Sequence, residues 1–279
     1  MARRALAVAT ATMMVTVSVV APANAQPVVI EQGSRFATSS DKSCTIGLND
    51  ASRGVSYSAA HCGKRGDLVF LVDENGYRRT TPVGTFEPSA RYDSRSASND
   101  WSVIKWYPGV TVKPNRFGGD YYPAQNLKPG EKICFHGYTT HGAGDASSCG
   151  RFIGNVGENV YYEAPVQMRS GDSGGPVFAP GKGTVGVVAG NTTISDGRRS
   201  ITLGRAAGTS DGPRVDLDSL NQLVAPIIGK PVRRAVQEPG DPKIATASEG
   251  SSKPLQIVGP MIAIFALALP FLGGLVKLG

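Results

Sequence analysis

Short apolar runs, each long enough for one strand, follow one another through most of the chain. They cover residues 45–48, 68–72, 101–106, 132–135, 160–162, 176–178 and 184–189. Segments rich in turn-forming residues separate several of them, at 73–76, 107–109, 128–130 and 179–183. Many short strands with turns at this spacing predict an all-β barrel or sandwich.

One later segment has the periodicity of a helix instead. Its apolar residues recur along one helical face, at Leu217, Leu220, Leu223, Val224 and Ile227. Asp216 stands directly before them and belongs to the residue types that cap helix N-termini. We therefore predict one amphipathic helix at the C-terminal end of the β domain.

The N-terminal end of the chain has the order of a secretory signal peptide. Arg3 and Arg4 precede an uncharged apolar run, which is followed by an Ala-Asn-Ala site at 23–25. A positive start, an apolar stretch and small residues at the end predict a signal peptide at 1–25. The alternative is an N-terminal membrane anchor, for which the apolar run is short.

The C-terminal end carries a longer apolar run. Residues 254–276 are 23 positions without a charged side chain. As a helix with a rise of about 1.5 Å per residue they would cross a hydrocarbon core of about 30 Å. A buried core helix is the alternative, but residues 229–253 before the run have the Pro, Gly and Ser content of a flexible linker. We expect a domain at 26–228, outside the membrane, anchored by a transmembrane helix at 254–276.

The net charge of the chain does not indicate a nucleic-acid-binding protein. The whole chain carries +7, but residues 26–228 hold 21 Lys and Arg against 19 Asp and Glu, a balance of +2. The rest of the positive charge lies in the predicted signal peptide, linker and tail. A nearly neutral domain has no strong electrostatic footprint for polyanions.

Four cysteines, Cys44, Cys62, Cys134 and Cys149, stand in the predicted domain. An even number in an exported chain indicates two disulfides, of which the sequence permits three pairings. Pairing between neighbours would close two short loops, each stabilised by about 3 kcal/mol in the chain-entropy model. A zinc site is the alternative, but the spacing lacks close cysteine pairs.

Two separated motifs carry the candidate chemistry, SAAHC at 58–62 and GDSGGP at 171–176. A serine hydroxyl needs a base before it can act as a nucleophile, and a histidine is the usual base. The motifs resemble those of the chymotrypsin-like serine proteases, GDSGGP and usually TAAHC; the first is identical and the second differs at Ser58. The resemblance covers most of residues 44–228. It implies two antiparallel six-stranded β-barrels, with the active site between them and a helix at the C-terminal end.

The resemblance implies a catalytic triad of His61, Asp100 and Ser173, in the order of that family. Asp100 leads into an apolar strand that would bury it, whereas its rival Asp93 lies in a segment rich in Ser and Arg. The backbone N–H groups of Gly171 and Ser173 would form the oxyanion hole. Taken alone, the serine motif could be an ordinary β-turn and His61 a structural histidine.

Asp172 is where the chain departs from its relatives. In zymogen-type relatives this aspartate pairs with a new N-terminus, but no Ile/Val-Val-Gly-Gly site precedes the domain. The chain is more similar to the bacterial streptogrisin and α-lytic group, in which an arginine inside the second disulfide loop takes that role. Tyr138 stands where that arginine would be. The sequence therefore leaves the partner of Asp172 open.

The resemblance also places the residues that would select the substrate. They lie ahead of the nucleophile and along the strand beyond it, at Gln167, Met168, Val188, Ala189 and Gly190. Gln167 offers no buried counter-charge for a basic side chain, and Met168 and Val188 would narrow the pocket. We expect a preference for small or medium apolar P1 residues. Ala189 stands where many relatives have a serine near the catalytic aspartate.

Together these features predict an exported, membrane-anchored serine endopeptidase that works through an acyl-enzyme. It would act as a monomer on proteins or peptides, without metal or cofactor. A catalytically silent protease-like binding domain is one alternative, although such domains usually lose a triad member. An esterase with the same triad is the other.

Overall fold

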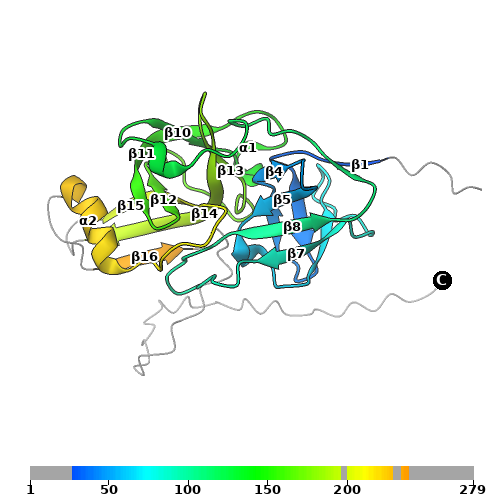
Figure 1. The fold of residues 1–279 in the computed structure, drawn as a ribbon, viewed down its shortest axis with the longest axis horizontal. Helices are drawn as coiled ribbons and strands as arrows, with labels where there is room; N and C mark the ends of the chain where they lie inside the picture. Colours follow the sequence, from blue (N-terminus) through cyan, green and yellow to red (C-terminus); the bar gives the residue numbers. More distant parts are fainter. Residues whose placement is uncertain (1–26, 196–199, 229–233, 239–279) are drawn as a thin grey trace, which may run out of the picture. The chain divides into compact units, whose positions relative to one another are not determined.

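The computed structural model describes residues 27–195, 200–228 and 234–238, and their regular structure is mainly β-strand (Figure 1). The predicted signal peptide at 1–25 and transmembrane helix at 254–276 lie outside these residues. No helix in the described part of the chain is long and apolar enough to cross a membrane.

The N-terminal half folds into an open antiparallel sheet of seven strands, in the order β3-β2-β6-β7-β8-β5-β4. The strands are β2 (Arg35–Thr38), β3 (Ser43–Thr45), β4 (Leu48–Asp50), β5 (Val55–Ser58), β6 (Leu68–Leu71), β7 (Gly84–Pro88) and β8 (Ser102–Trp106). Its concave side is filled by apolar side chains that include Phe36, Ile46, Phe86 and Ile104.

This first sheet corrects the expectation of two antiparallel six-stranded β-barrels. The end strands β3 and β4 are separated by only two residues of chain, and they pair with β2 and β5, not with each other. Closing this sheet by strand pairing would require β3 to pair with β4. They are joined by a bend and do not pair, so this half is a half-barrel.

The C-terminal half is a closed six-stranded barrel. Its strands are β10 (Lys132–Phe135), β11 (Ser148–Val156), β12 (Asn159–Tyr162), β13 (Pro176–Ala179), β14 (Gly183–Ser195) and β15 (Ser200–Ala207). The pairing of β13 with both β10 and β14 closes the ring. Its interior packs Ile133, Phe135, Phe152, Val185 and other apolar residues. The all-β class and the chymotrypsin-like architecture predicted from the sequence are confirmed in this form.

Shorter elements complete the described fold. They are β1 (Val28–Ile30), which pairs in parallel with β9 (Val110–Val112), the 3-10 helices η1 (Ala60–Cys62) and η2 (Ala124–Asn126), and the helix α1 (Tyr138–His141). Most apolar runs in the sequence correspond to strands, but residues 45–48 do not. They span the end of β3, the bend and the start of β4, because the first end of the run pairs with β2 and the second with β5.

The predicted C-terminal helix is present as α2 (Leu217–Ile228). Asp216 caps it, because its Oδ1 accepts a hydrogen bond from the N–H of Ser219 at 2.7 Å. Leu220 and Val224 are buried against the barrel, whereas Ile227 is 51% exposed. The helix therefore covers the barrel with only part of its apolar face.

The region predicted as a flexible linker, 229–253, contains one strand. This is β16 (Arg234–Glu238), which pairs antiparallel with β14 from Asn191 to Ser195 (Figure 1). The backbone of an edge strand is open to such strand addition whatever the side chains of the added segment. The other residues of the predicted linker lie outside the described part.

Both disulfides join neighbouring cysteines, as the loop lengths favoured. Cys44–Cys62 links β3 to η1, and Cys134–Cys149 links directly opposed residues of β10 and β11. Because all four sulfur atoms are in disulfides, none is available as a thiolate ligand for zinc.

Candidate active site

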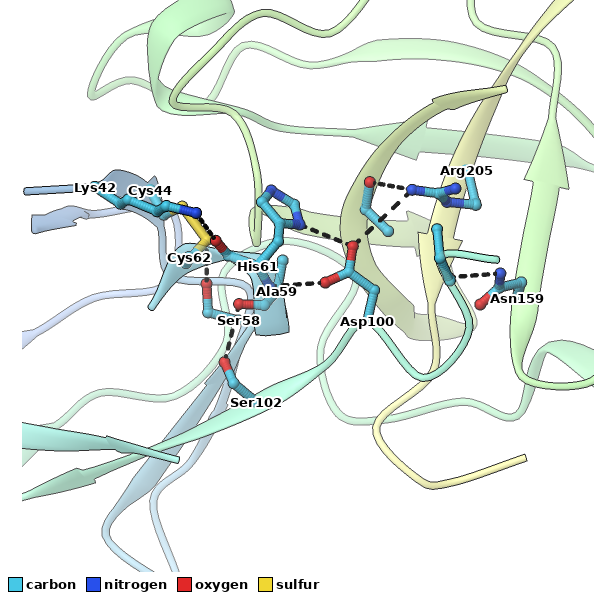
Figure 2. A network of polar contacts seen from close by, with 12 residues as sticks. Lys42, Cys44, Ser58, Ala59, His61, Cys62, Asp100, Ser102, Asn159 and Arg205 are labelled. Carbon is cyan, nitrogen blue, oxygen red and sulfur yellow. Dashed lines mark hydrogen bonds and ion pairs between the residues drawn. A yellow bond between two sulfur atoms is a disulfide. The ribbon is translucent and has the colours of Figure 1, made fainter. Parts of the chain in front are cut away.

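His61 lies in the tight 3-10 turn η1 that follows β5, and several bonds fix that turn. The disulfide from Cys62 to Cys44 ties it to β3, and the hydroxyl of Thr38 donates to the carbonyl of Cys62 at 3.0 Å. The Lys42 ammonium donates to the carbonyl of His61 at 2.8 Å. The imidazole is therefore held on a short, cross-linked segment at the end of a strand (Figure 2).

Asp100 lies beside His61 and contacts it twice. The Oδ2 atom is 2.8 Å from Nδ1 of the imidazole, and Oδ1 accepts the backbone N–H of His61 at 3.0 Å (Figure 2). Asp93 lies elsewhere, in an ion pair with Arg214 at 2.9 Å. Of the two candidate acids, Asp100 is therefore the one that lies beside His61.

The carboxylate of Asp100 is almost fully buried, which by itself would raise its pKa. Three other influences lower the pKa: the charge of His61, the two hydrogen bonds from His61, and the charge of Arg205. They outweigh the effect of burial, so the pKa of Asp100 is lowered overall. Asp100 is therefore an ionised hydrogen-bond acceptor. An acceptor at Nδ1 fixes the imidazole tautomer that has its proton on Nδ1 and a lone pair on Nε2.

The loop before Asp100 is strained and is held by the second barrel. Ala97 and Asn99 have positive φ angles of 48° and 55°. Asn159 of β12 donates to the carbonyl of Ala97 at 3.1 Å, and Gly212 donates to the side chain of Asn99 at 2.7 Å. Strain of this kind persists only where surrounding contacts over-determine the backbone. These contacts fix the direction in which Asp100 enters the site.

Ser173 comes from the second barrel, in a tight turn between Gly171 and Gly174. Both glycines have positive φ, 95° and 83°. A Cβ on Gly174 would overlap Oγ of Ser58, so glycine lets this turn approach the segment that leads to His61. The carbonyl of Ser173 accepts the N–H of Thr45 at 2.8 Å. The turn is thereby fixed against the first sheet.

Four groups at this junction are left without a hydrogen bond among the described residues. Nε2 of His61 and Oγ of Ser173 are buried polar atoms with no partner. The backbone N–H groups of Gly171 and Ser173 take part in none of the hydrogen bonds found in residues 27–195. Buried polar groups are rarely unsatisfied, and where they are, a catalytic role is one established reason.

Asp172, whose partner the sequence left open, is fully buried and accepts three hydrogen bonds. Thr140 donates its N–H to Oδ1 at 2.8 Å and its hydroxyl to Oδ2, and the N–H of Arg169 donates to Oδ2 at 2.7 Å. Tyr138, which stands in place of an arginine in the sequence, begins α1. The sequence analysis missed Thr140; a hydroxyl residue in the disulfide loop was the available signal.

The predicted pocket residues divide into two groups. Met168 and Val188 are buried in the barrel core together, and Ala189 and Gly190 are buried on β14. Gln167 is exposed. The carbonyl of Met168 accepts a hydrogen bond from Asn191 at 3.4 Å, which joins the segment before the nucleophile to β14.

The sequence analysis also missed Arg205, which is fully buried next to Asp100 (Figure 2). A single charged residue inside the otherwise uncharged segment 200–207 is the signal that could have found it. A charge in such a place is almost never buried unless it is paired.

The Trypsin family model matches residues 32–204. A search of curated proteins gives no match.

Three solved structures are similar to the chain. Protease A of Thermobifida fusca is 20% identical, with 76% of this chain and 100% of that chain covered and a TM-score of 0.44. The Nocardiopsis protease NAPase is 18% identical, with 66% and 94% covered and a TM-score of 0.43. Kallikrein-related peptidase 10, solved as a complex with Zn²⁺, is 12% identical, with 71% and 97% covered and a TM-score of 0.42.

Proposed function

This chain belongs to the trypsin family and is a serine endopeptidase, and we propose that Ser173, His61 and Asp100 are its catalytic triad. The observation that carries the proposal is the contact of His61 Nδ1 with Asp100 Oδ2 at 2.8 Å. That contact directs the lone pair of Nε2 away from Asp100. Both Nε2 and the hydroxyl of Ser173 are buried and have no hydrogen-bond partner among the described residues.

In this mechanism the Ser173 hydroxyl attacks the carbonyl carbon of the scissile peptide while Nε2 of His61 takes its proton. The tetrahedral intermediate collapses, the C–N bond breaks, and His61 gives the proton to the leaving amine. His61 then takes a proton from a water molecule, which attacks the resulting ester. The ester bond breaks, His61 returns the proton to the Ser173 oxygen, and the carboxylic acid product is released. Asp100 stabilises the imidazolium that forms in both steps and keeps its own charge.

The N–H groups of Gly171 and Ser173 are proposed as the oxyanion hole. Both are unused among the described hydrogen bonds, and the positive φ of Gly171 belongs to the backbone turn that carries them. Two such donors stabilise the oxyanion in the transition state by several kcal/mol, roughly 3–4 for a single donor. They need no rearrangement when the substrate arrives.

A fluorophosphonate probe tests the triad directly. Full-length protein should be labelled stoichiometrically, with the adduct mapped to Ser173, and Ser173→Ala should abolish labelling. Ser170→Ala, a serine replaced in the same segment, is the matched control and should keep it. Stoichiometric labelling at another residue would refute the triad. Complete absence of labelling in a folded protein would favour the silent binding domain, and turnover of ester but not peptide substrates would favour an esterase.

For the substrate we propose a preference for small or medium apolar P1 side chains. Met168 and Val188 share one core, and Gln167 is exposed and uncharged, so none of the proposed pocket residues supplies a buried acid to pair with Arg or Lys. A peptide-library profile measures this preference. A profile dominated by basic P1 residues is the result that would overturn it.

The enzyme is further proposed to be exported as a monomer and anchored in the membrane. The two disulfides agree with an oxidising compartment, and the apolar runs at 1–25 and 254–276 suit a signal peptide and a single membrane-spanning helix. Cell fractionation tests the anchor. Full-length protein should sediment with membranes and a chain ending at 253 should be released; equal release of both would exclude the anchor.

A further inference from the structure

Arg205 is the only lysine or arginine among the described residues that is fully buried. It lies on β15, where its backbone pairs with Gly190 of β14 on one side and with Tyr161 of β12 on the other. It therefore sits in the middle of the closed barrel wall. A guanidinium is charged at every pH that proteins tolerate, so its burial requires compensation at this place.

The compensation comes from the catalytic region. Nη2 of Arg205 donates a hydrogen bond to the carbonyl of Ala189 at 2.5 Å and lies 4.0 Å from Oδ2 of Asp100 (Figure 2). Oδ2 is the same oxygen that contacts His61. One carboxylate oxygen thus lies between an imidazole from the first sheet and a guanidinium from the second barrel.

Arg205 also connects the two halves of the site. Asp100 and His61 belong to the first sheet, whereas Ser173 belongs to the second barrel. The carbonyl of Val188, next to Ala189 on β14, accepts the N–H of Gly174 at 2.7 Å. A rigid path therefore leads from the nucleophile turn through β14 to the guanidinium, and from there to Asp100.

We propose that Arg205 is a positioning residue, which keeps Asp100 charged and holds the Asp100–His61 pair in register with the barrel that carries Ser173. This inference rests on the proposed triad. Arg205 touches neither substrate nor reacting atoms; it acts through Asp100. Ala189 on β14 has no side-chain hydrogen-bond donor for the Asp100 carboxylate. Arg205 on β15 instead provides a positive charge beside that carboxylate.

Several ionisable groups surround the pair and bear on its pH dependence. His61 approaches from η1, Tyr161 from β12, and Tyr92 and Asp93 from the loop before β8. Burial is the largest cause that raises the pKa of both tyrosines, so they remain neutral under assay conditions. Arg205 is then the fixed cation facing Asp100. Without it, the pKa of Asp100 rises and the carboxylate is protonated at a higher pH.

The test uses full-length protein and a double-mutant cycle between Arg205→Met and Asp100→Asn. In the otherwise unchanged enzyme, Arg205→Met should lower kcat by about tenfold, a size typical of residues in one network, with little change in KM. In the Asp100→Asn background the same change should cost almost nothing, because Arg205 then has no carboxylate to hold. The acid limb of the kcat/KM profile should move up by about one pH unit in Arg205→Met. Arg205→Lys keeps the charge and should keep the limb in place.

Leu220→Ala is the control for lost stability, because it removes buried packing under α2 away from Asp100. It should lower the unfolding temperature and leave the pH profile of the folded enzyme unchanged. Equal losses from Arg205→Met in both backgrounds, or an unmoved acid limb, would overturn the proposal. Should Arg205→Met fail to fold, Arg205→Lys decides: the proposal requires its acid limb to stay in place, and a shifted limb overturns it. Failure of the triad itself would be recognised separately, by probe labelling that survives Ser173→Ala.

Discussion

Thr140 holds the buried carboxylate of Asp172 with two hydrogen bonds, one from its backbone N–H at 2.8 Å and one from its hydroxyl. Asp172 directly precedes the proposed nucleophile, Ser173. No lysine, arginine or histidine forms an ion pair with Asp172 among the described residues, so neutral donors satisfy its charge. A buried anion is tolerated when backbone and hydroxyl donors saturate its oxygens.

Thr140→Val should weaken this support without changing the shape of the side chain. Losing a hydrogen bond to a charged group costs about 1.5–3 kcal/mol of unfolding free energy. Because Asp172 lies between Gly171 and Ser173, the proposed oxyanion donors, kcat/KM should fall as well. Urea unfolding and peptide hydrolysis measure the two effects. Thr193→Val, which removes a hydroxyl contact with Thr202 far along β14, should leave kcat/KM intact; equal activity losses in both variants would contradict this role.

The local features of this fold could be predicted from the sequence. The helix α2 follows from an apolar face and a cap at Asp216, and both disulfides follow from short loops. The choice of Asp100 rested on the family resemblance and on an acid at the start of a buried strand, and its catalytic role stays a prediction. In each case the deciding interactions act between residues close in sequence or carried by a recognisable motif.

The contacts that hold the site together could not be predicted in this way. Thr140 meets Asp172, and Arg205 meets Asp100, only after the strands have assembled, and neither pair follows a periodicity or spacing rule. The half-barrel was missed for a related reason. Whether β3 and β4 pair depends on a bend at 46–47 that apolar patterning does not encode.

Gly47, in that bend, is packed so closely that a methyl group does not fit. A Cβ there would lie 2.5 Å from Cγ1 of Val187 and would overlap the carbonyl oxygen of Gly174. Gly47→Ala should therefore push the nucleophile turn away from the first sheet, at a cost of about 1–3 kcal/mol in unfolding free energy. Thermal unfolding and the rate of fluorophosphonate labelling should both decline. Gly144→Ala has open space around its Cβ and should change neither; an unaffected labelling rate in Gly47→Ala would refute the steric argument.

His136 should make the stability of the domain fall in mild acid. The imidazole is buried and stacks on Phe117 with ring centres 4.3 Å apart, and burial is the largest cause that lowers its pKa below 6.5. Below pH 6.5 the imidazole of His136 binds a proton in the unfolded chain but stays neutral in the folded protein. The free energy of unfolding therefore decreases as the pH falls, until the lowered pKa of the folded state is reached. The slope is at most about 1.4 kcal/mol per pH unit.

His136→Asn isolates this contribution. The amide can still donate toward the carbonyl of Ala146, which now lies 2.8 Å from Nδ1, but it does not titrate. The free energy of unfolding is measured for both proteins between pH 7.5 and about pH 5, which spans the pH region where histidine usually titrates. The two values should converge as the pH falls. Parallel curves over that range would show that protonation of His136 does not contribute.

Met168 is expected to set the size limit of the proposed P1 pocket. Its Cε would lie 2.8 Å from a Cβ on Gly204, and Cε2 of the Tyr162 ring would lie 2.7 Å from the same Cβ. Met168→Ala should open this space and raise the ratio of kcat/KM for Phe over Ala at P1 by about tenfold or more, since each methylene accommodated contributes roughly 1–3 kcal/mol. Val224→Ala removes a buried side chain under α2 and should leave the ratio unchanged. If the ratio stays the same in Met168→Ala while the protein remains folded, another residue limits the pocket, and the proposed apolar preference loses its structural basis.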